Sequence, residues 1–491
     1  MKYKNPVIRG FYPDPSVCRA NGKYYLAASS FHYFPGVPLF ESQDLINWTQ
    51  VGYVLTRKSQ VMLEGLPSSG GVFAPTLRFH EGRFYVVTTN ATTQQNFYVY
   101  ADDIHGPWSD PVSIDQGGID PSLLFDNGRT YFISNGEADD GQGGITQCEI
   151  DIRTGEKLTS SRCIWKGTGG RCLEAPHMYH IGNDYYLFAA EGGTEYGHMV
   201  VCARGRSVWG PFENYPGNPV LTNRNRFPTI LQGIGHGDLV QDDDGGWHIL
   251  TLGFRQIHPW QAHHTLGREV LLHPLQLRED GWFTAGKGYA EEEYEMPGDF
   301  RQERKQVYTF ENTRWDVDWC YLRHPDEKNY HLMKDSLVLH GSSVTLDEAA
   351  SPTFIGLRQK DFDMELSVEA TVDGGEGGVT VYMSELEHYD LSVRRGKDGF
   401  EAVLRLNIGG IRHEQGVVQL SSGRARLLIR SDSETYHFFM NDGSEEHCLG
   451  HGMSKYLSSE VSGGFTGVML GLYAVGDGSA EFRSLRISYE P

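Results

Sequence analysis

The sequence predicts an all-β protein in which a five-bladed β-propeller is followed by a β-sandwich of the jelly-roll type. Three observations lead to this prediction. Five related segments recur over the first half of the 491-residue chain, and each has the pattern of a β-hairpin. The second half alternates apolar and polar residues between Gly-rich turns. No stretch has the apolar periodicity of a helix longer than a few turns.

The composition is that of a globular protein with a strong negative charge. The chain has 43 Lys and Arg against 64 Asp and Glu, a formal net charge of -21. A partner held through phosphate groups needs a clustered basic surface, and none is visible, so we expect neither nucleic acid nor a membrane as partner. Neither a signal-like apolar stretch nor the ~20 apolar residues of a membrane span occurs, which predicts a cytoplasmic location.

The five repeats share one register. Each holds a short apolar strand, a turn rich in Gly, Asn or Asp, and a second strand rich in Tyr, Val and Ile. Further strand-like stretches lie between the copies, so each unit contains about four strands. An aromatic residue or His follows each aligned start eleven residues later. The aligned starts are Asp14, Ala74, Asp120, Ala175 and Gly237.

The spacing of the copies favours radial repetition. The number of residues between successive repeat starts is close to the ~40–50 residues of a propeller blade. The first strands of the blades run along the central axis of a propeller, so the repeat starts should meet at one end of a funnel. A stacked solenoid is the alternative, and it would keep these positions apart.

The second domain is predicted from a change in the sequence near residue 290. Residues 290–299 are polar and contain a Pro-Gly pair, which indicates a linker or a crossing loop. Alternating strands then follow, for example at 363–370 and 424–429. We predict a propeller over 1–295, a linker over 296–308 and a sandwich over 309–491.

Three repeat starts carry acidic side chains. Asp14 opens the first copy, Asp120 the third, and Glu174 stands one place before the start of the fourth. Carboxyl groups crowded into one enclosed site have separated pKa values, so one stays ionised while another holds a proton near neutral pH. Such a pair can hydrolyse a glycosidic bond. A divalent cation is the alternative, although such sites usually add backbone oxygens and closer acid spacing.

Taken together, these motifs resemble glycoside hydrolase family 43. The resemblance extends from the propeller into the concanavalin-like sandwich of its β-xylosidase and arabinofuranosidase members. It rests on GFYPDPS at 10–16, DPS at 120–122, EAPH at 174–177, GHGD at 235–238, TLGRE at 265–269 and SPTFIGLRQ at 351–359.

The resemblance implies a mechanism that inverts the anomeric centre. Asp14 is then the general base, Glu174 the general acid, and Asp120 the carboxylate that raises the pKa of the acid and orients it. The residues alone do not say which carboxylate takes which role. An inverting pair lies ~6.5–9.5 Å apart to admit a water, against ~5–5.5 Å for a covalent nucleophile. No cofactor is required.

Four more residues are expected at the site from the resemblance. Arg268 should contact the bound sugar, with a structural salt bridge as the alternative. Phe31 and Phe73 should form aromatic walls of the sugar pocket, with core packing as the alternative. Phe73 replaces the Trp of many β-xylosidases, which leaves the preference between xylose and arabinose open. His236 should bind a structural calcium ion through several waters in the central channel, and a hydrogen-bonded core histidine is the alternative.

The implied substrates are xylo- or arabino-oligosaccharides of hemicellulose, from which terminal β-D-xylosyl or α-L-arabinofuranosyl units are released. A homo-oligomer is compatible with the sequence. One rival is a carbohydrate-binding propeller without catalysis, which would not need converging acids. Another is an endo-arabinanase, which would need an open groove across the propeller.

Overall fold

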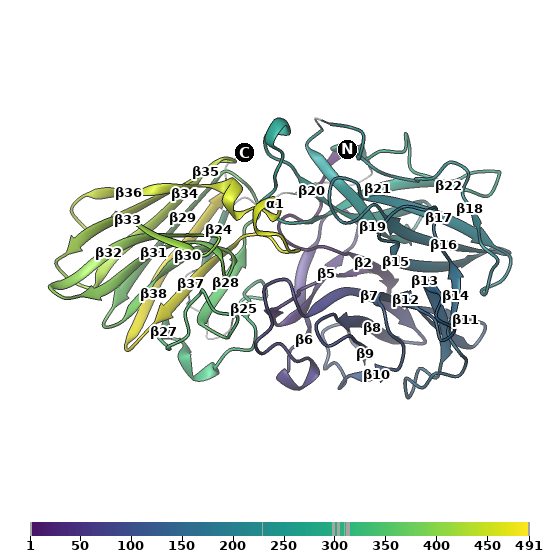
Figure 1. Cartoon of the computed structure of the whole chain (residues 1–491), viewed down its shortest axis with the longest axis horizontal. Coiled ribbons are helices and arrows are strands. Elements are labelled where there is room, and N and C mark those ends of the chain that lie inside the picture. Colours follow the sequence, from purple (N-terminus) through teal and green to yellow (C-terminus); the bar gives the residue numbers. More distant parts are fainter. Residues whose placement is uncertain are drawn as a thin grey trace.

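The computed structural model describes residues 2–227, 229–296, 300–301, 305–308, 310 and 315–489. Within these ranges the chain is built almost entirely of β-strands, and Figure 1 shows two bodies side by side. The short helices are η1 (Lys58–Gln60), η2 (Pro259–Gln261), η3 (Glu327–Asn329), η4 (Ser454–Leu457) and α1 (Ser459–Ser462). None of the helices in the described part of the chain is long and apolar enough to cross a bilayer.

The N-terminal body contains five four-stranded antiparallel sheets among the described residues. The first has β2 (Ser16–Ala20), β3 (Lys23–Ala27), β5 (Gly36–Ser42) and β6 (Thr49–Leu55). The second has β7 (Val72–His80), β8 (Arg83–Asn90), β9 (Gln95–Ala101) and β10 (Val112–Ile114). The third has β11 (Ile119–Asp126), β12 (Arg129–Glu137), β13 (Gly143–Ile150) and β14 (Arg162–Trp165). The fourth has β15 (Glu174–Ile181), β16 (Asp184–Glu191), β17 (Met199–Gly205) and β18 (Glu213–Asn214). The fifth has β19 (Leu231–Gln241), β20 (Trp247–Arg255), β21 (Glu269–Leu277) and β22 (Phe283–Thr284).

The turn that joins the first two strands of a sheet follows from its sequence. Asn21 and Gly22, between β2 and β3, both have positive φ, at 51° and 77°. Asn127 and Gly128, between β11 and β12, repeat this pair at 50° and 73°. Positive φ at both central positions gives the turn a twist that matches the flanking strands, and Asn-Gly adopts it at low cost.

The first strands of the five sheets form a closed ring. Each first strand contacts the next one: β2 contacts β7, β7 contacts β11, β11 contacts β15, and β15 contacts β19. β19 in turn contacts β2. Radial packing of this kind brings the N-terminal ends of these strands to one end of a shared axis, because all five follow the same direction. The residues that open the repeats are therefore neighbours in space.

The ring carries left-handed backbone at every repeat start. Left-handed conformations at residues other than Gly are uncommon and concentrate at functional sites. In the fifth copy the left-handed residue is His236, one place before the Gly237 that the repeat alignment selects. The φ values are 58° at Asp14, 22° at Ala74, 52° at Asp120, 55° at Ala175 and 48° at His236.

The C-terminal body is a sandwich of two antiparallel sheets around a large apolar core. One sheet has β24 (Lys305–Tyr308), β26 (Tyr330–Leu332), β27 (Leu337–His340), β29 (Met364–Val372), β34 (Arg424–Ser431), β35 (Thr435–Asn441), β36 (Glu446–Met453) and β38 (Ser479–Tyr489). The other has β28 (Thr353–Arg358), β30 (Glu376–Ser384), β31 (Glu387–Gly396), β32 (Gly399–Ile408), β33 (Ile411–Leu420) and β37 (Met469–Val475). Side chains that alternate along β29 and β34, such as Leu366 and Leu427, fill the core.

The segment between the two bodies is only partly described. Within the predicted linker at 296–308, positions 297–299 and 302–304 lie outside the described residues. Strand β24 begins inside this range and pairs with β38 of the sandwich. Farther along, β25 (Tyr321–Leu322) pairs with β4 (Tyr33–Phe34), which lies between β3 and β5 in the chain, and β1 (Lys2–Lys4) pairs with β23 (Glu293–Glu295).

The two bodies share a buried apolar interface. Phe11 and Tyr33 from the propeller pack in one cluster with Phe354, Tyr382 and Tyr473 from the sandwich. Burial of this much aromatic surface favours a fixed arrangement of the two domains.

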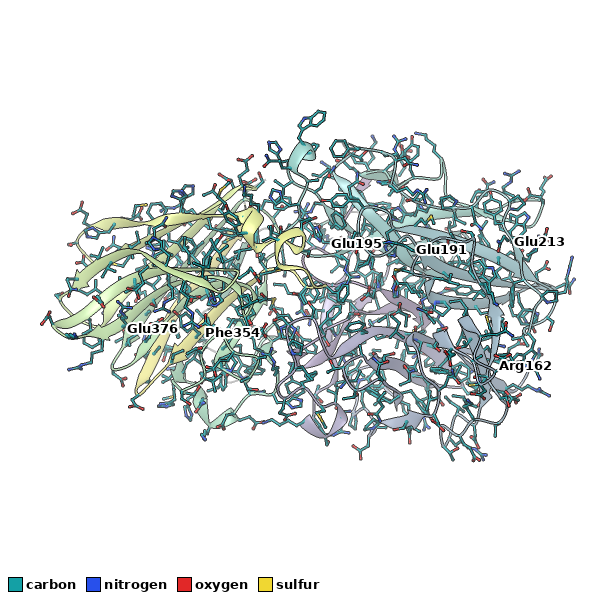
Figure 2. The ribbon with its side chains drawn as sticks, in the orientation of Figure 1. Arg162, Glu191, Glu195, Glu213, Phe354 and Glu376 are labelled. Carbon is teal, nitrogen blue, oxygen red and sulfur yellow. The ribbon has the colours of Figure 1, made fainter. Side chains whose placement is uncertain are left out.

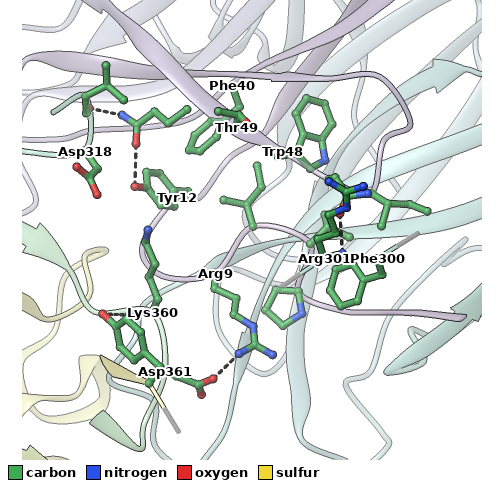
Figure 3. Close-up of a pocket in the computed structure, with 18 of the residues that line it drawn as sticks. Arg9, Tyr12, Phe40, Trp48, Thr49, Phe300, Arg301, Asp318, Lys360 and Asp361 are labelled. Atoms are coloured by element: carbon green, nitrogen blue, oxygen red, sulfur yellow. Dashed lines mark hydrogen bonds and ion pairs between the residues drawn. The ribbon is translucent and has the colours of Figure 1, made fainter. Parts of the chain in front are cut away.

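A pocket of about 880 Å³ opens at one edge of the junction (Figure 3). Tyr12, Phe40 and Trp48 of the propeller line it, together with Lys360 and Asp361 of the sandwich. Arg9, from the N-terminal segment, forms an ion pair with Asp361 across it. None of the sequence-predicted site residues lines this pocket.

Candidate active site

Asp14 lies two residues before the start of β2, at the end of the ring axis. Its Oδ1 accepts a hydrogen bond from Arg268 Nη1 at 2.9 Å, and its Oδ2 accepts one from Ser29 Oγ at 2.5 Å. His236 Nδ1 lies 3.6 Å from Oδ1. Burial alone would raise the pKa of Asp14, but Arg268, His236 and Ser29 together hold it below its ordinary value of 3.8. Asp14 is therefore ionised at neutral pH.

Glu174 is the first residue of β15 and is half-buried. Burial raises the pKa of its carboxyl group to about 7, and the negative charge of Asp14 adds to the effect. Glu174 therefore holds a proton for a large fraction of the time at neutral pH, while Asp14 does not. This difference is what an acid and base pair requires.

Asp120 joins the other two carboxyl groups. It is the second residue of β11, and its Oδ2 accepts a hydrogen bond from the backbone N–H of Ala175 at 3.2 Å. Burial raises the pKa of Asp120 well above its ordinary value, and the charges of Glu174 and Asp14 raise it further. Asp120 thus fixes the backbone directly after Glu174, and the charge of Glu174 acts on the carboxyl group of Asp120.

The guanidinium group of Arg268 is buried and forms hydrogen bonds with three different residues. Besides Asp14, its Nη1 donates to Thr194 Oγ1 at 2.8 Å, and its Nη2 donates to the backbone oxygen of Phe465 at 3.3 Å. The structure thus contains the ion pair that was the alternative for this residue. Contact with a sugar stays a prediction.

Phe31 and Phe73 lie together at the site. Their ring centroids are 5.1 Å apart in an edge-to-face arrangement. Phe31 is only 1% exposed and belongs to the core of the domain interface, as its alternative proposed, whereas Phe73 keeps a half-exposed face. A sugar pocket next to these rings would therefore meet Phe73 more directly than Phe31.

A third aromatic ring at this place comes from the sandwich. Phe465 stacks on Phe31 at 5.9 Å and meets Phe73 edge to face at 5.7 Å. Its backbone N–H donates to Ser69 Oγ at 2.8 Å. Sequence reasoning did not select Phe465, because it belongs to none of the repeats and no local pattern marks it.

The segment that carries Phe465 is attached to the propeller through Glu460. Glu460 Oε1 accepts a hydrogen bond from Tyr196 Oη at 2.9 Å and lies 2.8 Å from His264 Nδ1. Its Oε2 accepts the backbone N–H of His264 at 3.0 Å. These contacts fix the sandwich loop against the same propeller segment that bears Arg268.

His236 faces the site from the central channel. Its neighbours include His177, with ring centroids 6.2 Å apart. The buried Nε2 atoms of His177 and His198 have no hydrogen-bond partner among the described residues. In the same part of the chain, no group of three or more His, Cys, Asp and Glu side chains is placed to hold a metal ion. Calcium prefers oxygen ligands, so these nitrogen atoms do not by themselves fit it. The calcium ion stays a prediction that depends on water for its ligands.

A buried ionic network holds the blades together below the site. Asp238 lies on β19 and accepts hydrogen bonds from Ser16 Oγ at 2.6 Å and from Arg78 Nη1 at 2.7 Å. Tyr179 donates to the same carboxylate. The three donors come from β2, β7 and β15, so one side chain links four of the five sheets and fixes the repeat starts relative to one another.

Two family models match the chain. Residues 3–283 match glycosyl hydrolases family 43, and residues 307–488 match the β-xylosidase C-terminal concanavalin A-like domain. These matches confirm the predicted propeller and the predicted C-terminal sandwich.

Relatives match over nearly the whole length. A non-reducing end α-L-arabinofuranosidase of Bacteroides ovatus, BoGH43B, is 38% identical over 97% of this chain and 92% of its own. A xylosidase/arabinosidase of Butyrivibrio fibrisolvens is 33% identical over 99% and 98%. The solved structure of the Bacteroides ovatus xyloglucan PUL GH43B superimposes with a TM-score of 0.95 at 36% identity, over 100% of both chains.

Proposed function

The chain belongs to glycosyl hydrolases family 43, and from this premise we propose that it is an inverting exo-glycosidase. It releases terminal β-D-xylosyl or α-L-arabinofuranosyl units from hemicellulose oligosaccharides. The cluster formed by Asp14, Asp120 and Glu174 is the observation that carries the proposal. The names of the relatives support the two pentoses.

The reaction uses the two protonation states of the cluster. Ionised Asp14 takes a proton from a water molecule that attacks the anomeric carbon. Protonated Glu174 gives its proton to the leaving oxygen on the other side of the sugar. Asp120 binds the backbone N–H beside Glu174 and so orients the acid. A direct attack by water inverts the anomeric centre.

The sandwich supports exo action. The loop around Phe465 meets the propeller at Ser69 and Arg268, on one side of the carboxylate cluster. A long polymer that crosses the propeller would collide with this sandwich loop. An endo-acting arabinanase is therefore disfavoured.

A paired substrate assay tests the proposed class. We expect turnover of aryl β-D-xylopyranoside, aryl α-L-arabinofuranoside or both, and the ratio of the two kcat/KM values ranks the pentoses. Binding of pentosyl oligosaccharides without turnover of these or related glycosides would instead support a carbohydrate-binding propeller.

The protonation states predict the pH dependence of kcat/KM. Glu174 must be protonated, so activity falls as the pH rises through about 7. Asp14 must be ionised, so the acid limb lies below the ordinary Asp value of 3.8. A pH profile with an aryl glycoside measures both limbs. A basic limb above pH 9 would contradict the role given to Glu174.

Phe465→Ala tests the contribution of the sandwich. Loss of the aromatic wall should raise KM by ~10-fold with a smaller change in kcat, because the ring contacts the bound sugar rather than the reacting groups. Val461→Ala, in the short helix α1 four residues before Phe465, is the matched control, since Val461 is half-exposed. Equal KM values for both variants would show that Phe465 does not bind the sugar.

Three further expectations remain proposals. A cytoplasmic location suits the uptake of short oligosaccharides, and fractionation of cells would test it. A homo-oligomer is tested by sedimentation of the purified protein. A structural calcium ion is tested by metal analysis of the protein before and after dialysis against a chelator.

A further inference from the structure

Two exposed charged side chains, Arg171 and Glu195, lie near enough to the acid Glu174 for their charges to act on it. Arg171 stands three residues before Glu174, and it forms an ion pair with Glu195. Glu195 follows Thr194, which accepts the hydrogen bond from Arg268. The two side chains are 63% and 61% exposed. Figure 2 shows Glu195 in the propeller near its junction with the sandwich.

The loop that bears Arg171 is held by a buried carboxylate. Glu191 ends β16 and is fully buried. It accepts the backbone N–H of Thr168 at 2.6 Å and that of Gly170 at 3.2 Å, and the Thr168 hydroxyl also donates to it. A buried carboxyl group that accepts three hydrogen bonds is a strong local constraint on the backbone. The loop that leads to Glu174 is therefore fixed before substrate binds.

The neighbouring loop is tied to Arg171 itself. Arg171 Nε donates to the backbone oxygen of Gly192 at 2.9 Å, and the Gly192 N–H donates back to the Arg171 oxygen at 2.8 Å. The position of the guanidinium group is thus set at its inner end, while its outer end faces solvent beside Glu195. The entropic cost of binding a ligand to such a preorganised group is small.

The chemistry of the reaction places the leaving group here. Glu174 protonates the leaving oxygen, so the leaving group sits on the solvent side of Glu174. The charges of Glu195 and Arg171 both affect the pKa of Glu174, the first upward and the second downward, which agrees with this proximity. A guanidinium donor beside a carboxylate acceptor matches neighbouring hydroxyl groups of a sugar, which donate and accept hydrogen bonds.

We propose that Arg171 and Glu195 bind hydroxyl groups of the leaving-group sugar and so favour oligosaccharides over glycosides whose leaving group lacks hydroxyls. This inference rests on the proposed function and adds the side chains that recognise the leaving group. A solvated surface ion pair without this role contributes little to stability or binding.

The test is the double variant Arg171→Met/Glu195→Gln. It removes one positive and one negative charge together, so the net charge near Glu174 is unchanged. We compare kcat/KM for a pentosyl oligosaccharide with that for an aryl glycoside of the same pentose. The expected loss is ~10-fold for the oligosaccharide and at most ~2-fold for the aryl glycoside. Equal losses for both substrates, or no loss for either, would overturn the inference.

The matched control is Arg83→Met/Asp102→Asn. This ion pair, at 2.7 Å, has side chains that are 40% and 77% exposed, and it lies on β8 and the turn after β9, outside the site. The control should leave both kcat/KM values unchanged. The basic limb of the pH profile on the aryl glycoside should stay in place in the double variant, which separates loss of binding from a change in Glu174. If the unmodified enzyme hydrolyses neither substrate, the proposed function fails. If the unmodified enzyme hydrolyses both substrates, the proposed function stands, and the losses in the double variant test the roles of Arg171 and Glu195 alone.

Discussion

Asp14→Asn should lower kcat by ~10³–10⁴-fold on every glycoside, whatever its leaving group. Asn has the size of Asp but cannot take a proton from water. Because the attack of water then lacks its base in all cases, the loss should not depend on how easily the leaving group departs. Measuring kcat over a series of aryl glycosides with phenols of different acidity checks this expectation.

A control must separate loss of the base from damage to the site, because Arg268 loses its buried ionic partner in this variant. Azide attacks without a base, so it should restore part of the activity of Asp14→Asn and yield a glycosyl azide. Thermal unfolding of the variant measures the structural cost separately. A loss in kcat that grows steadily with the pKa of the leaving phenol would mean that Asp14 acts on the leaving group, and it would contradict the role of Asp14 as the base.

Glu174→Gln should have an effect that depends strongly on the leaving group. Oligosaccharides, whose leaving sugars need protonation, should lose ~10³–10⁴-fold in kcat. Dinitrophenyl glycosides should lose less than ~10-fold, because their leaving group departs without a proton. The basic limb of the pH profile near 7 should disappear with the carboxyl group that causes it.

Glu213→Gln is the matched control for this variant. It makes the same change in the same sheet, on the exposed strand β18, away from the site. Its kinetics should equal those of the unmodified enzyme on both kinds of substrate. Equal losses of Glu174→Gln on oligosaccharides and dinitrophenyl glycosides would remove the assignment of Glu174 as acid.

Much of the propeller could be predicted because the same pattern is repeated. Turns rich in Gly, Asn or Asp set the hairpins, and a common register placed Asp14 and Asp120 at equivalent strand ends. Radial packing then brings these positions to one axis, although more than a hundred residues separate them. The contact between Asp120 and the residue after Glu174 follows from this arrangement.

The parts of the site that could not be predicted depend on contacts without a repeated pattern. Phe465 reaches Arg268 and Phe73 only because the sandwich packs on the propeller, and its own sequence resembles an ordinary surface loop. Glu191 is a strand-end residue whose role becomes visible only with the loop at Thr168 in place. In the fifth repeat, the alignment of the repeat starts is one residue off. It selects Gly237, whereas the residue with left-handed backbone is His236.

The stereochemistry of the first product tests the central role of Asp14 and Glu174 most directly. Proton NMR during the first minutes of hydrolysis distinguishes the anomers before they equilibrate. A water activated by Asp14 and a leaving group protonated by Glu174 yield the sugar with the anomeric configuration opposite to that of the substrate. A first-formed sugar that keeps the substrate's configuration would mean a covalent intermediate and would contradict the mechanism.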